Sequence, residues 1–273
     1  MLECVINISE GRDLDRVAQI GRAAGSALLD VHSDPHHNRS VLTVVGEDAA
    51  RAIATAAVTE LDLRAHEGVH PRLGVLDVVP FIALEGSADA EAIAARDRFA
   101  AWLSGTHGVP CFLYGPERSL PEVRREAFRA LAPDRGPASP HPTAGATAVG
   151  QRGVLVAYNV WLGGSDLAAA RRIAAAVRGP GIRALGLLVG ERLQVSMNLI
   201  EPTTLGPAEA YDRVTAACRE AGATVEGAEL VGLAPEAALR AVPEQRWDEL
   251  DLSAERTIEA RLEEMVRRKK LRG

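Results

Sequence analysis

The order in which strand-like and helical stretches follow one another constrains the fold of this 273-residue chain most strongly. In the first half, short runs rich in Val, Ile and Leu alternate with stretches that have helical periodicity. The expected strands cover residues 2–8, 27–31, 40–45 and 75–84, and the expected helices cover 13–26 and 47–63. This order, β-α-β-β-α-β, is typical of the ferredoxin-like unit.

The second half repeats the same order, with a different set of connections before it. Strands are expected at 154–161, 184–189, 194–199 and 225–231, and helices at 165–178 and 207–221. Residues 85–150 add two helices, a strand at 109–114 and an irregular stretch from 132 to 150 that is rich in Pro, Gly and Ala. The sequence therefore predicts an α/β fold, an α+β sandwich of two ferredoxin-like βαββαβ subdomains with mixed sheets, helices on the outer faces and a groove between them.

Charge and cysteine content narrow the class of protein. The net charge of −6 disfavours non-specific nucleic-acid binding. No apolar run approaches the roughly eighteen residues of a membrane-spanning helix, and no secretory leader is recognised. Cys4, Cys111 and Cys218 lie far apart and match neither a metal site nor a disulfide framework. We therefore expect a cytoplasmic protein without nucleic-acid or membrane partners.

The stretch H-E-G-V-H-P-R-L-G-V-L-D-V-V-P-F, residues 66–81, is the first candidate for chemistry. Pro71 fixes its own φ and biases His70 toward an extended conformation, just before a buried strand. A histidine on such a rigid turn is well mounted for proton transfer. The alternative is a turn histidine that only hydrogen-bonds the backbone.

Five of the seven histidines fall into two turns, accompanied by Asp30, Asp34 and Asp77; they are His32, His36, His37, His66 and His70. A metal site is one interpretation, but the spacings match no known ligand pattern. The other interpretation is acid–base catalysis by one histidine that a carboxylate orients. Because of these spacings we predict no metal. Glycine motifs for dinucleotides or a P-loop are missing from the sequence, so we also predict no nucleotide cofactor.

A glycine-rich turn leads into the strand at 154–161, where backbone without side chains would let a flat ligand approach closely. Tyr158 and Trp161 offer stacking surfaces, and Asn159 offers a hydrogen-bond donor and an acceptor. The alternative is a strand whose aromatic residues fill the core.

Taken in order along the chain, these segments resemble the glutamate formiminotransferase family. The matching text is E-C-V-I-N-I-S-E-G-R from residue 3, L-L-D-V and N-R-S-V from 28 and 38, the stretch 66–81, G-V-P-C-F-L-Y-G from 108, P-D-R-G-P from 133, G-A-T-A-V-G and L-V-A-Y-N between 145 and 159, Q-V-S-M-N-L from 194, and E-L-V-G-L-A-P from 229. These segments keep the family's order over nearly the whole chain.

The resemblance implies a homodimeric transferase that moves a formimino group from N-formimino-L-glutamate to N5 of tetrahydrofolate, the co-substrate. The implied subdomains are 1–163 and 164–250, followed by a helical tail at 251–273. His70 matches the family's catalytic histidine. The family's folate-binding segment falls on Arg152, Gly153, Val154, Leu155, Val156, Ala157, Tyr158, Asn159, Val160 and Trp161.

Further roles follow from the chemistry of this transfer. One imidazole, His70, can accept a proton from the attacking amine and return it to the leaving amine. Asp34 and Asp77 are candidates for a carboxylate beside the cationic amidinium, and Arg39 and Arg72 for forks that bind substrate carboxylates. We also expect His32, Asn38 and Asn198 to contact substrate.

Three departures from the family's text fall near the expected site. His32 stands where the family usually has Asp, Val69 where it has Glu, and Trp161 where it has Asn. They leave two alternatives open: a non-catalytic paralogue that binds a folate or an amino-acid derivative, and a related one-carbon or acyl transferase with another substrate.

Overall fold

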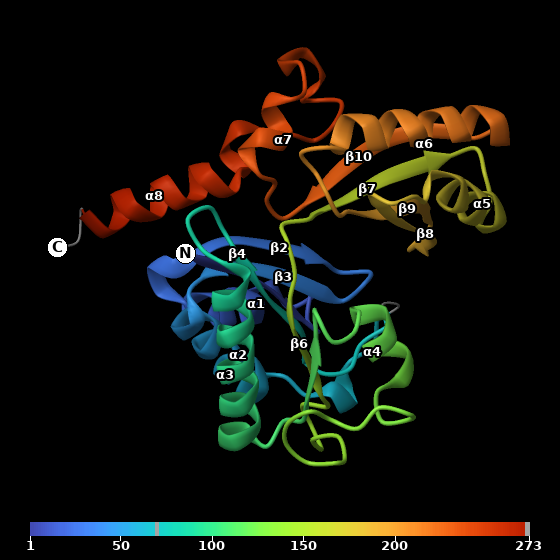
Figure 1. Ribbon diagram of the computed structural model, residues 1–273. Coiled ribbons are helices and arrows are strands. Elements are labelled where there is room, and N and C mark those ends of the chain that lie inside the picture. The colour runs from blue at the N-terminus through green and yellow to red at the C-terminus, as the bar shows by residue number, and fades with distance from the viewer. Residues whose placement is uncertain (69–70, 271–273) are drawn as a thin grey trace. The chain divides into compact units, whose positions relative to one another are not determined.

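The computed structural model describes residues 1–68 and 71–270 (Figure 1). The chain forms two compact units, Met1–Gly153 and Val154–Gly273. The family resemblance placed the subdomain boundary after residue 163. In the structure the strand β7, Val156–Gly163, pairs with strands of the second unit, so the compact units divide at Gly153.

The sheet of the first unit has six strands in the order β2-β3-β1-β4-β6-β5. β1 pairs antiparallel with β3 and β4, and β2 pairs antiparallel with β3, which confirms the predicted ferredoxin-like order. β6 pairs parallel with β4 and with β5, so this sheet is mixed. The strands are β1 Leu2–Ile8, β2 Leu28–Asp34, β3 Arg39–Val45, β4 Leu76–Ala83, β5 Cys111–Tyr114 and β6 Thr147–Gln151.

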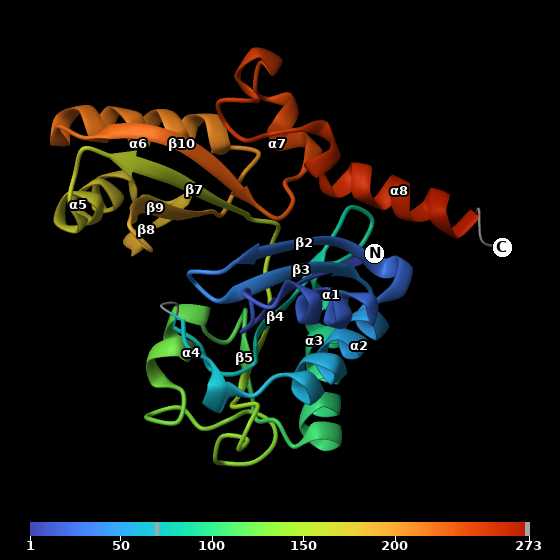
Figure 2. The same cartoon turned by 180° about the vertical axis from the view of Figure 1, so that it is seen from behind.

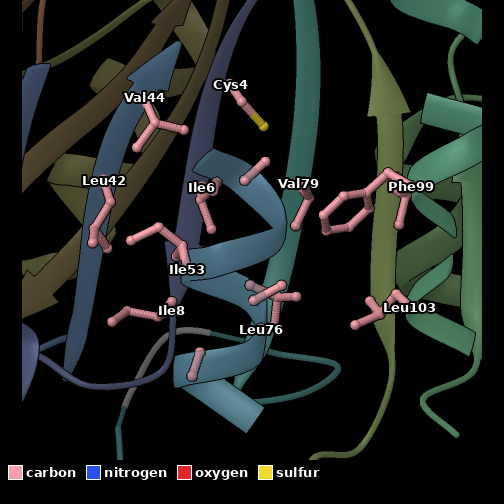
Figure 3. Close-up of a cluster of buried hydrophobic side chains, with 14 of the residues drawn as sticks. Cys4, Ile6, Ile8, Leu42, Val44, Ile53, Leu76, Val79, Phe99 and Leu103 are labelled. Atoms are coloured by element: carbon pink, nitrogen blue, oxygen red, sulfur yellow. The ribbon is translucent and has the colours of Figure 1, made fainter. Parts of the chain in front are cut away.

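Three helices pack on one face of this sheet: α1 Leu14–Arg22, α2 Glu47–Glu60 and α3 Asp89–His107 (Figures 1 and 2). Cys4, Ile6 and Ile8 of β1 point into the space beneath them, where Ile6 lies near Ile53 of α2 and Phe99 of α3 lies beside Val79 of β4 (Figure 3). Because strand side chains alternate between faces, the residues between these core positions project from the other face. That second face carries the polar side chains of the candidate site.

The end of the second face near β5 and β6 is covered by α4, Leu120–Glu126. A capping box between Ser119 and Glu122 begins this helix. Val123 of α4 packs with Phe112 and Ala148 in a cluster separate from the main core. Over β1, β2 and β3, no helix of residues 1–68 and 71–153 packs on this face, which we call the helix-free face of the first sheet.

The strand β6 begins inside the stretch 132–150 that the sequence suggested was irregular. It is short and contains Gly150, and its central position between two other strands comes entirely from tertiary pairing. A Cβ added to Gly150 would lie 2.0 Å from the ring of Tyr114, so the tyrosine ring packs where a side chain would otherwise be.

The second unit repeats the ferredoxin-like order in a four-stranded sheet, β10-β7-β9-β8, as predicted. The expectation of a mixed sheet is wrong here, because the three strand pairs that the structure describes in this sheet are all antiparallel. Gly186 of β8 allows α5 to approach, since an added Cβ would lie 2.4 Å from the backbone of Ala170. The elements are α5 Leu167–Val177, β8 Ile182–Val189, β9 Arg192–Leu199, α6 Pro207–Ala221 and β10 Thr224–Val231.

The chain ends with α7 Glu236–Arg240 and α8 Ile258–Lys270, the latter within the predicted tail helix. Short 3-10 helices occur at Gly25–Ala27, Leu63–Ala65, Glu244–Arg246 and Ala254–Arg256. None of the helices described is long and apolar enough to cross a membrane.

Candidate functional site

Three segments of the first unit meet near the start of β4, and Asn38 ties them together. Its side-chain Oδ1 accepts from Gly11 N at 2.9 Å, and its Nδ2 donates to Glu67 O at 2.9 Å. The ring of His66 bonds to the Asn38 carbonyl, with Nε2 2.7 Å from O. Asn38 has a φ of 49°, in the left-handed region that Asn tolerates better than most residues. Asn38, which the sequence suggested as a substrate contact, is therefore a buried residue that anchors residues 66 and 67 to the turn between β2 and β3.

Two glycines allow these segments to approach closely. A Cβ added to Gly11 would lie 2.4 Å from Asp34 O, and one added to Gly68 would lie 2.5 Å from His37 O. Neither position has room for a side chain. The turn between β2 and β3 is thus clamped between the loop after β1 and the segment that leads to residue 69.

Asp34 caps that turn. Its Oδ1 accepts from the backbone N–H groups of His36 and His37 at 2.8 and 2.9 Å, and its Oδ2 lies 3.0 Å from His37 Nδ1. Burial by itself would raise the pKa of Asp34, but the hydrogen bonds from His37 and His36 prevail and lower it to about 2. The carboxylate is therefore ionised at neutral pH, and both of its oxygens are used in holding the turn.

Asp77 lies at the other side of the loop and is 1% exposed. Its Oδ2 pairs with Arg124 Nη2 of α4 at 2.7 Å, and its Oδ1 accepts from Leu73 N at 2.8 Å. Arg124 Nη1 also donates to Pro71 O at 2.8 Å. The carboxylate that the sequence placed beside the electrophile is thus committed to an arginine and to the backbone of the loop.

Two further arginines lie nearby, Arg39 close to this ion pair and Arg72 against residues 66 and 68. Arg39 projects from β3 on the helix-free face and donates through Nη2 to Asn7 Oδ1. Burial lowers the pKa of Arg39 to about 10; Asp77 opposes that shift, and Arg124 adds to it. Arg72 donates to His66 O at 2.7 Å and to Gly68 O at 3.3 Å. Arg39, Arg72 and Arg124 thus lie around Asp77 and the segments on either side of residues 69 and 70.

His70 and Val69 lie outside the described residues. On either side of them, residues 66–68 and 71–73 are fixed by the bonds to Asn38, Arg72, Arg124 and Asp77 given above. The sequence motif therefore lies between two anchored flanks.

The remaining predicted substrate residues lie apart from one another. His32 is half-buried on the helix-free face of β2, opposite Val41. Asn198 is exposed on β9 of the second unit, opposite Ala157 and Arg183. His32 lies on the same face of the first sheet as Asn7 and Arg39, whereas Asn198 lies on the second sheet.

The predicted folate segment is divided between the units. Arg152 and Gly153 end the first unit, where Arg152 N donates to Phe81 O at 3.3 Å, and burial lowers the pKa of the Arg152 guanidinium. Val154 and Leu155 lead into β7, on which Val156, Tyr158 and Val160 enter the core beneath α5 and α6. Ala157, Asn159 and Trp161 alternate with them and so occupy the opposite face.

Tyr158 and Trp161 consequently differ in what they can contact. Tyr158 is 0% exposed, and its hydroxyl donates to Leu250 O at 2.9 Å, which assigns it to the core. Trp161 is half-buried and carries the guanidinium of Arg192 at 4.3 Å from its ring centre. Asn159 Nδ2 donates to Glu229 Oε2 at 3.0 Å. Of the two aromatic residues, Trp161 is the one on the face of the second sheet opposite α5 and α6, which we call the helix-free face of that sheet.

Sequence reasoning missed three residues of these two faces. Arg124 reads as a solvent-facing residue of a short helix, and Asn7 and Arg192 as ordinary polar positions in alternating strands. The alternation itself was the available signal for Asn7, which lies between the core residues Ile6 and Ile8, whereas Arg192 begins its strand after an exposed turn. In the part of the chain that the structure describes, no group of three or more His, Cys, Asp or Glu side chains is arranged to hold a metal ion.

Comparison with known proteins points to one family. Residues 1–152 match the formiminotransferase domain, N-terminal subdomain. The glutamate formimidoyltransferase of Streptococcus pyogenes serotype M1 is 35% identical over an alignment 275 residues long, gaps included, that covers 89% of this chain and 92% of that protein. The glutamate formimidoyltransferase of Thermoplasma acidophilum is 35% identical over 88% of this chain and 89% of its own. The formimidoyltransferase-cyclodeaminase of Sus scrofa is 35% identical over 88% of this chain and 51% of its own length.

Proposed function

This chain belongs to the formiminotransferase family, and from that premise we propose that it transfers a formimino group from N-formimino-L-glutamate to N5 of tetrahydrofolate. The observation that carries the proposal is the 35% identity to a glutamate formimidoyltransferase along 89% of this chain. The enzyme is then a one-carbon transferase, and tetrahydrofolate is its co-substrate.

The transfer exchanges one nitrogen for another on the amidine carbon. N5 of tetrahydrofolate attacks that carbon and loses a proton, and the C–N bond to the glutamate nitrogen breaks as this nitrogen gains one. We assign both proton transfers to His70, because an imidazole with a pKa near 6.5 can accept and return a proton at neutral pH.

Asp34 and Asp77 act in this proposal as positioning residues. Each carboxylate already binds protein groups through both oxygens, Asp34 within the β2–β3 turn and Asp77 with Arg124 and Leu73 N. They therefore support the loop that carries His70 from its two sides. We also assign His32 of β2 and Asn38 of the β2–β3 turn to this site, His32 through its place on the helix-free face and Asn38 through its bonds to Gly11 and Glu67.

The presence of Arg39 and Arg72 in this part of the first unit supports binding of a dicarboxylate. Guanidinium groups bind carboxylates through two parallel hydrogen bonds. We assign the substrate's glutamate carboxylates to Arg39 and Arg72. Asn198 and residues 152–161 are assigned to folate, with Ala157, Asn159 and Trp161 as the contacts from the helix-free face of β7 and Tyr158 as core support.

The deciding experiment measures turnover with defined donors. The purified chain is incubated with tetrahydrofolate and either N-formimino-L-glutamate or N-formyl-L-glutamate, and the glutamate released is quantified by chromatography. We expect release with the formimino donor at a rate far above that with the formyl donor. Release with the formyl donor alone would identify the related acyl transferase, and saturable folate binding without release would identify the binding paralogue that His32, Val69 and Trp161 suggest.

The assembly and location also remain proposals. We infer a homodimer, and a cytoplasmic location in keeping with three buried free cysteines. Light scattering coupled to size-exclusion chromatography measures the mass directly. A mass of twice 29.0 kDa is expected, and a mass of 29.0 kDa would contradict the dimer.

A further inference from the structure

The helix-free face of the second sheet contains a buried side chain whose hydrogen-bonding groups are not used. Gln194 lies on β9 between Leu193 and Val195, both of which pack beneath α5 and α6. Strand alternation therefore directs Gln194 to the other face. The residue is 0% exposed, and neither its Nε2 nor its Oε1 has a hydrogen-bond partner among the described residues.

An unsatisfied carboxamide in a buried position destabilises a folded protein, because both polar groups have given up water and gained nothing. Other buried amides of this chain are bonded: Asn38 to Gly11 and Glu67, and Asn159 to Glu229. Of these three buried amides, Gln194 is the one with neither polar group bonded to a described residue. A ligand that supplies the missing donor and acceptor accounts for it.

The neighbours of Gln194 indicate the shape of that ligand. Across the ladder, Gln194 pairs with Trp161 on β7 and with Leu187 on β8, so a flat aromatic and an aliphatic side chain flank it. The guanidinium of Arg192, two positions earlier on the same face, lies against the Trp161 ring. These neighbours are suited to a planar ring whose edge carries polar groups.

We propose that Gln194 recognises the pterin ring of the folate by pairing with its amide edge. Its Oε1 accepts the ring N3–H, and its Nε2 donates to the C4 carbonyl oxygen, which is the pairing of two amides. Trp161 supplies the adjoining apolar surface. This assignment rests on the proposed function and adds to it a residue that selects for the pterin part of the substrate.

The assignment separates the pterin ring from the rest of the folate. A site with unsatisfied polar groups discriminates strongly against analogues that lack the matching groups. The chain should therefore bind 5-formyltetrahydrofolate, which has the ring, more tightly than p-aminobenzoyl-L-glutamate, which lacks it. In Gln194→Met, which keeps length and loses both hydrogen bonds, that preference should largely disappear.

Isothermal titration calorimetry of the full chain with these two probes tests the proposal. Gln194→Met should bind 5-formyltetrahydrofolate about tenfold or more weakly, the effect of losing buried hydrogen bonds, and p-aminobenzoyl-L-glutamate as before. Met197→Leu is the matched control, because Met197 lies on the same strand and packs into the core on the opposite face. It should bind both probes like the unaltered chain.

Thermal unfolding without ligand gives a second readout that a purely structural role would not produce. Because Gln194 has no partners to lose, Gln194→Met and Gln194→Leu should unfold at the same or a higher temperature than the unaltered chain. Weaker pterin binding together with undiminished stability supports the assignment. An unchanged preference for the pterin-containing probe in both variants overturns it, as does lower stability with no loss of preference.

The outcomes also separate this inference from the proposed function. If the unaltered chain binds no folate, both fail. If it binds and turns over folate and Gln194→Met does so equally well, only the role of Gln194 fails.

Discussion

Arg124 Nη2 of α4 lies 2.7 Å from Asp77 Oδ2 of β4, and the same guanidinium bonds to Pro71 O through Nη1. Asp77 in turn holds Leu73 N. One ion pair thus fixes the backbone of Pro71 and Leu73, just C-terminal to His70 in the sequence. Because Asp77 is almost fully buried, neither partner can be removed without leaving the other poorly compensated.

Replacing Arg124 should therefore cost stability and turnover together. In Arg124→Met the carboxylate of Asp77 stays buried without its partner, and we expect the free energy of unfolding to fall by about 3 kcal/mol. The double variant Asp77→Asn/Arg124→Met should be less destabilised than the sum of the single changes. Urea unfolding of the four proteins closes the double-mutant cycle, and additive effects would show that the pair is not coupled.

Asn38 combines a positive φ with two side-chain hydrogen bonds, and two substitutions separate these contributions. Asn38→Gly accepts the backbone angle and loses the bonds, whereas Asn38→Ala loses the bonds and also strains the backbone. We expect Asn38→Ala to be less stable than Asn38→Gly by about 1 kcal/mol. Equal unfolding free energies for the two variants would argue that the left-handed angle is not maintained.

The Asp34 carboxylate should make stability depend on acid. Its folded pKa of about 2 lies below the unfolded value of about 3.9. The stabilisation is therefore complete above about pH 4 and is lost as the pH falls toward 2. Since the group is partly accessible to solvent, the contribution is on the order of 1–2 kcal/mol. The difference in unfolding free energy between the unaltered chain and Asp34→Asn should shrink between pH 5 and 2, and a constant difference would contradict the assignment.

Local sequence signals predicted the elements whose formation depends on neighbouring residues. The predicted strands and helices of both ferredoxin-like units appear in the structure, and Asp13 and Ser119 cap the helices that follow them. The strand β6 was missed because Thr147–Gln151 is short and follows a long stretch rich in Pro and Gly. Its position is set by pairing with β4 and β5 and by the ring of Tyr114, which no local pattern records.

The candidate site was predictable as a set of residue types and less so as a set of contacts. The clustering of His and Asp drew attention to two turns, and residues of both turns, Asn38 and His66, are hydrogen-bonded to each other in the structure. Their partners came from distant segments: Arg124 lies 47 residues beyond Asp77, and Gly11 lies 27 residues before Asn38. Long-range partners of this kind are not encoded in spacing, so the two carboxylates were expected to be freer than they are.

His70 is expected to carry the proton transfers. His70→Ala should lower turnover on the order of a hundredfold or more, the usual contribution of acid–base catalysis, with little change in unfolding temperature. His36→Ala is the matched control, because His36 is an exposed histidine of the neighbouring turn. Steady-state kinetics with formiminoglutamate measures the effect, and near-normal turnover in His70→Ala would remove His70 from the mechanism.

Tyr158 should matter for stability and not for folate. Its hydroxyl bonds to Leu250 O within the core of the second unit. Tyr158→Phe keeps the ring and loses this bond, so the free energy of unfolding should fall by about 1 kcal/mol. Calorimetric titration with 5-formyltetrahydrofolate should give an unchanged affinity. A loss of affinity at unchanged stability would return Tyr158 to the ligand site.

Trp161 is expected to show the reverse pattern. It occupies the helix-free face where the family usually has Asn, and its indole can donate one hydrogen bond but accept none. Folate binding should therefore depend here on stacking, worth roughly 0.5–1.5 kcal/mol, so Trp161→Ala should weaken it about two- to tenfold. Reduced folate should quench tryptophan emission, and the quenching should be lost in Trp161→Ala. Because Trp102 and Trp247 also emit, Trp102→Phe serves as the control. Quenching that persists in Trp161→Ala but disappears in Trp102→Phe would contradict this assignment and place the folate on the first unit instead.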